Sequence, residues 1–376
     1  MIPCQRARFA MPDEVHYLNC AYMSPLSHAV SQALVDGALR KQAPWTYRPA
    51  DFFDVTERFR SRAARITGVP ADTIAIVPSA SYGLAVAARN LPLAKGQRIV
   101  LLADQFPSNV YPWRNLAQRD GAVIDTVQRD PDAAWTEGVL DAIGPDTGIV
   151  AVPHCHWADG RIVDLMAVGR KCREHGAALV LDLTQSLGAM PIDLAAVQPD
   201  FAVAACYKWL MAPYGTGLLY VAPRHHGGEP VEHNWINRCG SEDFARLVDY
   251  RDDYQPGARR FDMGEKANPP LLDGAGAGIE FLLEFGVDAI AHTLAMQSEV
   301  IAREAGELGF SSAPLEQRGP HFLALGFPAG VPEGLTERLA GRQVHVSLRG
   351  TSLRVTPHLY NNEADRAALI EVLKAI

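Results

Sequence analysis

The chain has 376 residues, of which 48% are hydrophobic and 21% are charged, and its net charge of −8 comes from both signs spread along the sequence. This composition indicates a globular protein, and an acidic chain without a basic stripe is a poor candidate for nucleic-acid binding. It holds no apolar run of about 18 residues for a membrane span, and residues 1–13 contain no apolar signal core. Six cysteines without a CxxC pair predict reduced thiols, so we expect a cytoplasmic protein.

Short apolar runs alternate with helical patterns through the first two thirds of the chain. We expect helices at residues 84–90 and 167–175. The expected strands are residues 74–77, 98–102, 148–152 and 178–182, the run that leads into Tyr207, and residues 218–221. This alternation predicts an α/β fold with a mostly parallel sheet that helices cover on both faces. Ligands of such sheets bind outside the carboxyl ends of the strands, so polar residues there are candidates for function.

The character of the sequence changes after about residue 255. Residues 274–308 predict one or two long helices. Short strands at residues 323–325 and 353–355 then precede a terminal helix after Asn361. This second pattern indicates a smaller α+β domain.

The expected domain organisation follows from this change. The length of the chain fits two domains. We expect a large domain of residues 15–255 and a small C-terminal domain of residues 256–376, with residues 1–14 packed near the small one. The loop 250–270, rich in Asp, Arg, Gly and Pro, is expected at the junction.

Lys208 lies between two apolar runs of the expected sheet. Burial lowers the pKa of a lysine, and a neutral amine can form a Schiff base with a carbonyl cofactor. An isolated lysine in this position more often extends its amine to solvent. The other residues at the strand ends therefore decide between the two interpretations.

Two loops that follow strands carry residues suited to a planar phosphorylated ligand. Small residues and free N–H groups at Ser79-Ala80-Ser81, before a helix, suit a phosphate, although a serine there is usually only an N-cap. The ring of Phe106 can stack on a flat cofactor, although packing in the core or in a lid is the simpler interpretation.

An acidic residue and two histidines follow two further strands. Asp182 ends an apolar strand, where a protonated pyridine nitrogen is a natural partner and a helix cap is the alternative. Gln185 can then reach a phenolic oxygen on the same ring. His154 and His156 have i, i+2 spacing, but no third ligand with suitable spacing supports a metal site. A hydrogen bond from this pair to a ring or a substrate is the better prediction.

Together these residues offer a phosphate site, a stacking ring, an acid for a pyridinium and an amine for an aldehyde. Each stands at a strand end of one expected sheet. Pyridoxal phosphate requires this combination, because its aldehyde needs an amine and its ring nitrogen needs a carboxylate to stay protonated.

The sequence resembles the class V aminotransferases of the fold-type I pyridoxal-phosphate enzymes, from Tyr17–Ala21 to Tyr360-Asn361. The stretch from Asp182 to Ala189 and the stretch from Tyr207 to Gly217 carry the most specific part of the resemblance. It implies that Lys208 is the catalytic Schiff-base lysine. The cofactor-binding residues that it implies are Ala80, Ser81, Phe106, His156, Asp182, Gln185, Tyr207, Lys208, Trp235 and Asn268.

The resemblance also indicates how a substrate and a second subunit contribute. Arg354 matches the arginine that holds the substrate carboxylate, through two parallel hydrogen bonds. Asn268 matches a position that reaches the neighbouring subunit's cofactor phosphate, and Trp235 belongs to the same set, so a homodimer with shared sites is implied. For the substrate side chain, Tyr22 is a candidate. His28, Trp45, His156, Trp157 and Arg259 are unranked alternatives.

Three departures separate the chain from the cysteine desulfurases of this family. Those enzymes stack a histidine where this chain has Phe106, and they usually have a histidine where it has Tyr207. They also carry a nucleophilic cysteine in a late loop, and residues 344–352 contain none. Phe106, Tyr207 and Asn268 instead resemble the kynureninase and isopenicillin-N-epimerase-like branches.

The expected function is therefore a pyridoxal-phosphate enzyme that acts at Cα of an amino acid, nominally an aminotransferase. A lyase, a kynureninase-like hydrolase, an epimerase and an inactive binding protein of the same fold remain alternatives. A nicotinamide-binding Rossmann enzyme is disfavoured, because the glycine run 274–280 has Ile279 at its third position and follows no strand. A serine hydrolase is disfavoured because the chain has no Gly-x-Ser-x-Gly motif.

Overall fold

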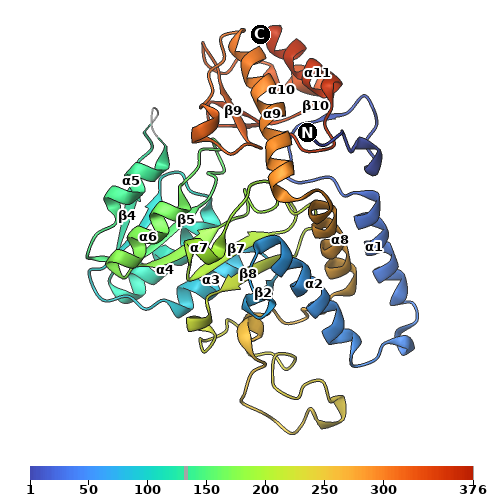
Figure 1. Ribbon diagram of the computed structural model, residues 1–376, viewed down its shortest axis with the longest axis vertical. Helices are drawn as coiled ribbons and strands as arrows, with labels where there is room; N and C mark the ends of the chain where they lie inside the picture. The colour runs from blue at the N-terminus through green and yellow to red at the C-terminus, as the bar shows by residue number, and fades with distance from the viewer. Residues whose placement is uncertain (131–133, 376) are drawn as a thin grey trace.

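The computed structural model describes residues 1–130 and 134–375. Residue 376, the last of the expected C-terminal domain, lies outside the described residues. A large α/β part occupies the middle of the molecule, and the C-terminal strands and helices lie at one end beside the N-terminal segment (Figure 1). The fold class predicted from the sequence is confirmed.

A seven-stranded sheet forms the centre of the large part, in the order β2-β8-β7-β6-β5-β3-β4. Only β8 runs antiparallel to its neighbours, so the other six strands have their carboxyl ends at one edge. The strands are β2 (Ile74–Val77), β3 (Arg98–Leu102), β4 (Val123–Val127), β5 (Thr147–Pro153), β6 (Ala178–Asp182), β7 (Phe201–Ala205) and β8 (Gly217–Val221).

Helices cover both faces of this sheet, because alternate residues of each strand point to opposite sides. On β5, Ile149 packs with helices α3 and α4, whereas Val150 packs in the core that includes α2, α5, α6 and α8. These helices and their neighbours are α1 (His28–Arg40), α2 (Asp51–Thr67), α3 (Ala80–Asn90), α4 (Tyr111–Asp120), α5 (Trp135–Ala142), α6 (Leu165–His175), α7 (Leu194–Val197) and α8 (Pro269–Phe285).

The C-terminal part is built on a three-stranded antiparallel sheet in the order β11-β12-β9. A separate parallel pair joins β1, near the N-terminus, to β10. The elements are α9 (Val287–Gly306), β9 (Leu323–Gly326), α10 (Leu335–Gly341), β10 (Val344–His345), β11 (Ser347–Arg349), β12 (Ser352–Val355), α11 (Glu363–Lys374) and β1 (His16–Tyr17).

Single turns of 3-10 helix complete the fold at η1 (Arg6–Arg8), η2 (Pro44–Thr46), η3 (Ala71–Thr73), η4 (Pro107–Asn109), η5 (Pro223–His225), η6 (Phe244–Arg246), η7 (Gly257–Phe261) and η8 (Leu315–Gln317). The N-terminal residues contact the C-terminal part directly. The backbone N–H of Gln5 donates to Leu359 O at 2.7 Å, and Arg6 forms an ion pair with Asp365 at 3.3 Å. No helix among the described residues has the length and apolarity needed to cross a membrane.

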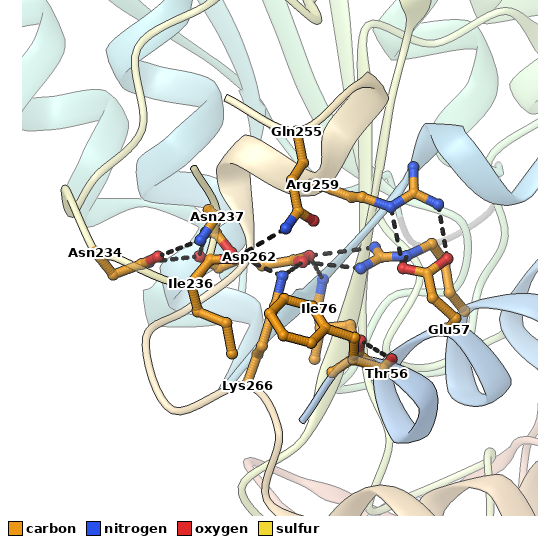
Figure 2. A network of polar contacts seen from close by, with 12 residues as sticks. Thr56, Glu57, Ile76, Asn234, Ile236, Asn237, Gln255, Arg259, Asp262 and Lys266 are labelled. Atoms are coloured by element: carbon orange, nitrogen blue, oxygen red, sulfur yellow. Dashed lines mark hydrogen bonds and ion pairs between the residues drawn. The ribbon is translucent and has the colours of Figure 1, made fainter. Parts of the chain in front are cut away.

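The sequence indicated that the loop 250–270 lies at the junction of the two parts, and this prediction is wrong. It runs along β2, where Met263 N donates to Ile76 O at 2.9 Å. Asp262, fully buried, accepts from Ile76 N at 2.7 Å and pairs with Arg60 at 2.8 Å and Lys266 at 2.9 Å (Figure 2). These buried ionic contacts fix the loop to the edge of the large sheet, which a sequence pattern of turn residues cannot show.

Candidate active site

A cavity of about 210 Å³ lies at the carboxyl ends of the parallel strands. Its walls come from the segments that follow β2, β3, β5, β6 and β7, together with the loop before β8. Seven of the ten cofactor-binding residues that the resemblance implies line it: Ala80, Ser81, Phe106, Asp182, Gln185, Tyr207 and Lys208. The topology produces this convergence, because parallel strands bring their carboxyl ends to one edge.

Lys208 lies three residues beyond β7, and its side chain is 7% exposed. Burial lowers the pKa of its amine to about 8, and the nearby Asp182 carboxylate opposes this shift only in part. Among the described residues, none forms a hydrogen bond or an ion pair with the Lys208 amine. Its nearest ring neighbours are Phe106 and Tyr207, whose centroids lie 5.6 and 5.5 Å from Nζ. The amine is therefore buried, free to react, and neutral in a large fraction of molecules near pH 8.

Asp182 is the last residue of β6 and faces the same cavity. Burial raises the pKa of its carboxyl group, while a hydrogen bond from Thr184 N at 3.0 Å and the charge of Lys208 favour ionisation. Asp182 does not cap a helix, because its hydrogen bond from Thr184 N closes a turn and no helix begins there. A cationic partner in the cavity would stabilise the buried carboxylate.

The N-terminus of α3 forms another wall of the cavity. Ser79 caps the helix by accepting from Tyr82 N at 3.2 Å, and its hydroxyl lies 2.8 Å from that of Ser81. The cap leaves the N–H groups at the start of the helix available for an anion. Gly83 allows α3 to approach the sheet, because a Cβ there would lie 2.6 Å from Cγ2 of Val203. With Ser79 as its cap, the helix begins at Ala80, four residues before the start that the sequence pattern predicts.

Two aromatic rings form a corner of the cavity. Phe106 meets Trp157 edge to face, with ring centroids 5.5 Å apart. The indole N–H of Trp157 donates to Asp104 O at 2.7 Å, which holds the ring in place. The sequence placed Trp157 only among unranked residues, and the structure makes it a wall of the site.

Gln185 and Tyr207 contribute polar groups to the cavity. Gln185 donates to Ala21 O at 3.2 Å through Nε2 and accepts from Trp209 Nε1 at 2.9 Å through Oε1. One amide N–H of Gln185 is left for another acceptor. Tyr207 stacks at a tilt on Tyr214, with centroids 4.5 Å apart, and burial raises the pKa of its hydroxyl to about 12. The hydroxyl of Tyr207 is therefore a hydrogen-bond donor at neutral pH.

Arg354 lies on β12, in the C-terminal part, and its side chain is 1% exposed. It donates to Trp157 O at 2.7 Å, which brings it to the aromatic corner. Burial lowers the pKa of its guanidinium to about 10, so it remains charged at neutral pH. Its positive charge also lowers the pKa of Lys208.

His156 does not line the cavity in the described chain, so its contact with the cofactor stays a prediction that this geometry does not support. A β-bridge between Cys155 and Ile162 follows the end of β5, and His156 N donates to Arg161 O at 2.8 Å. The chain has left its extended path here, so the imidazole turns away and packs on Trp135 at 5.1 Å. The next residue, Trp157, takes the place at the cavity.

Arg354 reaches the aromatic corner but does not line the cavity, and three other candidates also lie outside the cavity walls within this single chain. Tyr22 is 55% exposed, and Trp235 is 44% exposed and packs edge to face on Phe244. Asn268 caps α8 by accepting from Leu271 N at 3.3 Å. No group of three or more histidine, cysteine or acidic side chains with the geometry of a metal site occurs among the described residues.

The cavity residues fit pyridoxal phosphate. A buried amine without a hydrogen-bond partner suits the aldehyde, and a buried carboxylate held by one backbone N–H suits a protonated ring nitrogen. The start of α3 suits the phosphate. Gln185 retains one N–H for an oxygen on the ring.

Comparison with known families supports the same chemistry. A family model described as "Aminotransferase class-V" matches residues 45–352. The uncharacterized aminotransferase YcbU of Bacillus subtilis is 27% identical over 365 residues, which cover 94% of this chain and 91% of that protein. A kynureninase of Deinococcus radiodurans is 29% identical over 271 residues, which cover 69% of this chain and 64% of that protein.

Solved structures show the same fold. A cysteine desulfurase from Thermococcus onnurineus, described as an apo structure, superposes with a TM-score of 0.87 at 20% sequence identity, and covers 100% of this chain and 98% of that one. At this identity the similarity establishes the architecture and leaves the reaction to be argued from the residues of the site.

Proposed function

The chain belongs to the class-V aminotransferase family of pyridoxal-phosphate enzymes, and from this premise we propose that it transfers the amino group of an amino acid. The observation that carries the proposal is that Lys208 and Asp182 line one cavity without forming an ion pair with each other. Burial moves the pKa of the lysine down and that of the aspartate up, so each group is poorly solvated and suited to a partner.

Bound in this cavity, pyridoxal phosphate would supply a carbonyl that condenses with amines and a ring that accepts electrons from a bond broken at Cα. Lys208 is the residue that would hold the cofactor covalently. Once the substrate amine takes its place, the free Lys208 amine would act as the base for the Cα proton, because burial lowers its pKa to about 8 and so leaves a substantial neutral fraction near that pH.

The remaining cavity residues, together with Arg354 next to the aromatic corner, would position the two reactants. Asp182 would hold a proton on the ring nitrogen, and the start of α3 with Ser81 would bind the phosphate. Arg354 would bind the α-carboxylate of the substrate, since its guanidinium has only a carbonyl as hydrogen-bond partner in the described chain. Phe106 and Trp157 would exclude water from one side of the ring.

Cleavage of the substrate side chain is a second candidate reaction, which the similarity to kynureninases favours. Desulfurase chemistry has less support, because it needs a reactive thiolate. Cys155 lines the cavity, but it donates to Gly160 O at 3.3 Å and burial raises its pKa. Cys20 is also buried, and its pKa is raised in the same way.

We also propose that two copies of the chain form the active enzyme. Asn268 and Trp235, which resemble residues that reach a neighbouring cofactor, are exposed here and lie outside the cavity. Trp235 belongs to a protruding segment, residues 233–252, that also exposes Val248 and Tyr250, at 74% and 90% (Figure 1). A dimer contact would bury such apolar side chains. Sedimentation velocity of the purified protein tests this, and a monomer at all concentrations would argue against it.

The test of the proposed function begins with cofactor loading. Protein incubated with pyridoxal phosphate and then desalted is expected to keep a visible absorbance band, and Lys208→Ala is expected to lose it. Lys95→Ala, at an exposed position, is the matched control and should keep the band. An unchanged band in Lys208→Ala would contradict the assignment.

A panel of amino acids then distinguishes the reactions. A transaminase forms one equivalent of 2-oxo acid per site and stops until an acceptor oxo acid is added. A lyase continues to turn over and releases a side-chain fragment, whereas an epimerase exchanges the Cα proton with solvent without net loss of substrate. Turnover without dependence on an acceptor would reject transamination.

A further inference from the structure

Arg349 and Arg354 lie on the same face of the β11–β12 hairpin. The register pairs Ser347 with Arg354 and Arg349 with Ser352. Side chains of directly paired residues share a face, and so do side chains two positions apart on one strand. The two arginines are therefore diagonal neighbours, a relationship that places side chains roughly 7–8 Å apart at their bases.

A path of contacts connects this face of the hairpin to the segment that carries Lys208. Ser347, which is paired directly with Arg354 and lies two positions before Arg349, donates to Asn19 Oδ1 at 2.8 Å in a buried hydrogen bond. The residue after Asn19, Cys20, donates through its thiol to Lys208 O at 3.8 Å. Consistent with this path, the charges of both arginines lower the pKa of Lys208, and the charge of Arg349 lowers that of Arg354.

Neither arginine has a carboxylate partner in the described part of the chain. Arg354 donates to Trp157 O, and the only hydrogen bond recorded for the Arg349 side chain goes to Leu348 O at 2.8 Å. Two buried arginines elsewhere in the chain have acidic partners: Arg60 pairs with Asp262, and Arg318 pairs with Glu299. Two neighbouring guanidinium groups without counter-charges repel each other, and an anion that binds both relieves this repulsion.

We propose that the substrate is an amino acid with an acidic side chain, whose α-carboxylate binds Arg354 and whose second acidic group binds Arg349. This inference rests on the proposed function, because it assigns Arg354 to the α-carboxylate. A neutral side chain would satisfy only one of the two guanidinium groups. A charge-assisted hydrogen bond is worth about 1.5–3 kcal/mol, so we expect a preference of roughly 10- to 100-fold for the acidic substrate over its amide.

Binding of unreactive analogues tests the proposal without turnover. Isothermal titration calorimetry on the cofactor-loaded protein compares glutarate with its monoamide, which has nearly the same shape and one charge fewer. The wild type is expected to bind glutarate at least tenfold more tightly. Arg349→Gln should abolish this difference, whereas Arg354→Gln should weaken both ligands.

Arg342→Gln is the matched control, since Arg342 is an exposed arginine of the same region that pairs with Glu371 at 3.7 Å. It should keep the preference for glutarate. Equal binding of the two ligands by the wild type, or a full preference in Arg349→Gln, overturns the proposal. If Arg349→Gln instead weakens pyridoxal phosphate itself, the second anion is the cofactor phosphate, and the substrate proposal is rejected.

Kinetics with paired substrates provides a second measurement. Glutamate with glutamine, and aspartate with asparagine, should differ in kcat/KM in the wild type and become similar in Arg349→Gln. If the proposed function is wrong, the cofactor-loading experiment shows it separately, because the visible band is then absent or does not depend on Lys208. The substrate class and the cofactor chemistry are thus tested separately.

Discussion

The indole N–H of Trp209 donates a hydrogen bond to Oε1 of Gln185 at 2.9 Å, and this contact fixes the orientation of the Gln185 amide. An indole N–H can only donate, so the amide must present its oxygen to Trp209. On the other side, Ala21 O can only accept, so it requires the amide nitrogen, 3.2 Å away. The remaining N–H of Gln185 is therefore held as a donor for the cavity.

Trp209→Phe is expected to loosen this arrangement. The substitution leaves Oε1 of Gln185 without its donor and allows the amide to rotate. Loss of one oriented hydrogen bond predicts a two- to tenfold weaker affinity for pyridoxal phosphate, with a changed pH dependence of the visible band. Spectrophotometric titration of the cofactor measures both.

Trp113→Phe serves as the control for this prediction. Trp113 is also fully buried and donates to an amide oxygen, that of Asn109, at 2.8 Å, but neither residue lines the cavity. The control should lose stability without the spectroscopic change. If both variants behave alike, Trp209 has only a structural role.

The reactivity of Lys208 is expected to follow pH with a midpoint near 8. Its pKa in the folded protein is about 8, below the ordinary value of 10.5, so the amine gains nucleophilicity as pH rises through 8. Acetic anhydride labelling of the cofactor-free protein, with each lysine peptide quantified by mass spectrometry, measures the midpoint.

Asp182→Asn sharpens this prediction about Lys208. The Asp182 carboxylate raises the pKa of the lysine, so its removal should move the labelling midpoint below 8. Exposed lysines such as Lys95 provide the internal reference in the same digest. A midpoint for Lys208 that matches this reference would contradict the buried, desolvated amine.

The convergence of Lys208 and Asp182 on one cavity is predictable from the sequence, for a topological reason. Each follows an apolar run, and parallel strands deliver their carboxyl ends to one edge of the sheet. Strand β4 was not predicted, because it lies at the exposed edge of the sheet and its residues, Val-Ile-Asp-Thr-Val, form neither a continuous apolar run nor an alternating pattern. The sequence therefore predicts which residues meet at the carboxyl ends of the buried parallel strands, but it does not predict the strand at the exposed edge of the sheet.

The roles of His156 and Arg349 depend on geometry beyond the strands. The resemblance places His156 near the cofactor, but the bridge between Cys155 and Ile162 bends the chain after β5, and Trp157 lines the cavity instead. Arg349 reaches Arg354 only through the hairpin register, which turns at Gly350. A single sequence does not specify that register, so the pair of arginines was missed.

Gly83→Ala is expected to displace the start of α3 from the cavity. A Cβ at this position would lie 2.6 Å from Cγ2 of Val203 and 3.3 Å from Cδ1 of Leu219, so the helix must shift outward. Overpacking of this kind costs about 1–3 kcal/mol. Weaker binding of pyridoxal phosphate and of inorganic phosphate should accompany the loss, as measured by calorimetry.

Gly306→Ala, at the end of α9, is the control for the change at Gly83. A Cβ there meets no heavy atom within 4 Å, so this substitution should leave both stability and phosphate binding nearly unchanged, or improve stability slightly. Normal phosphate binding by Gly83→Ala would show that the position of α3 does not determine the anion site.

Asp262→Asn is expected to destabilise the protein by about 3–5 kcal/mol, because it leaves Arg60 and Lys266 buried without their shared counter-charge. Burial opposes ionisation of Asp262, but Arg60 and Lys266 outweigh it and lower its pKa below 3.8. A carboxyl group whose pKa is lower in the folded protein than in the unfolded chain stabilises the fold at pH values above its unfolded pKa. The contribution of Asp262 is thus complete above pH 3.8 and is lost as pH falls through the folded value. Urea unfolding at neutral pH should therefore show the full effect.

Asp249→Asn, which breaks only the exposed pair with Arg246, should change stability by less than about 1 kcal/mol. Equal effects of the two variants would mean that the buried network does not hold the loop 250–270 against β2.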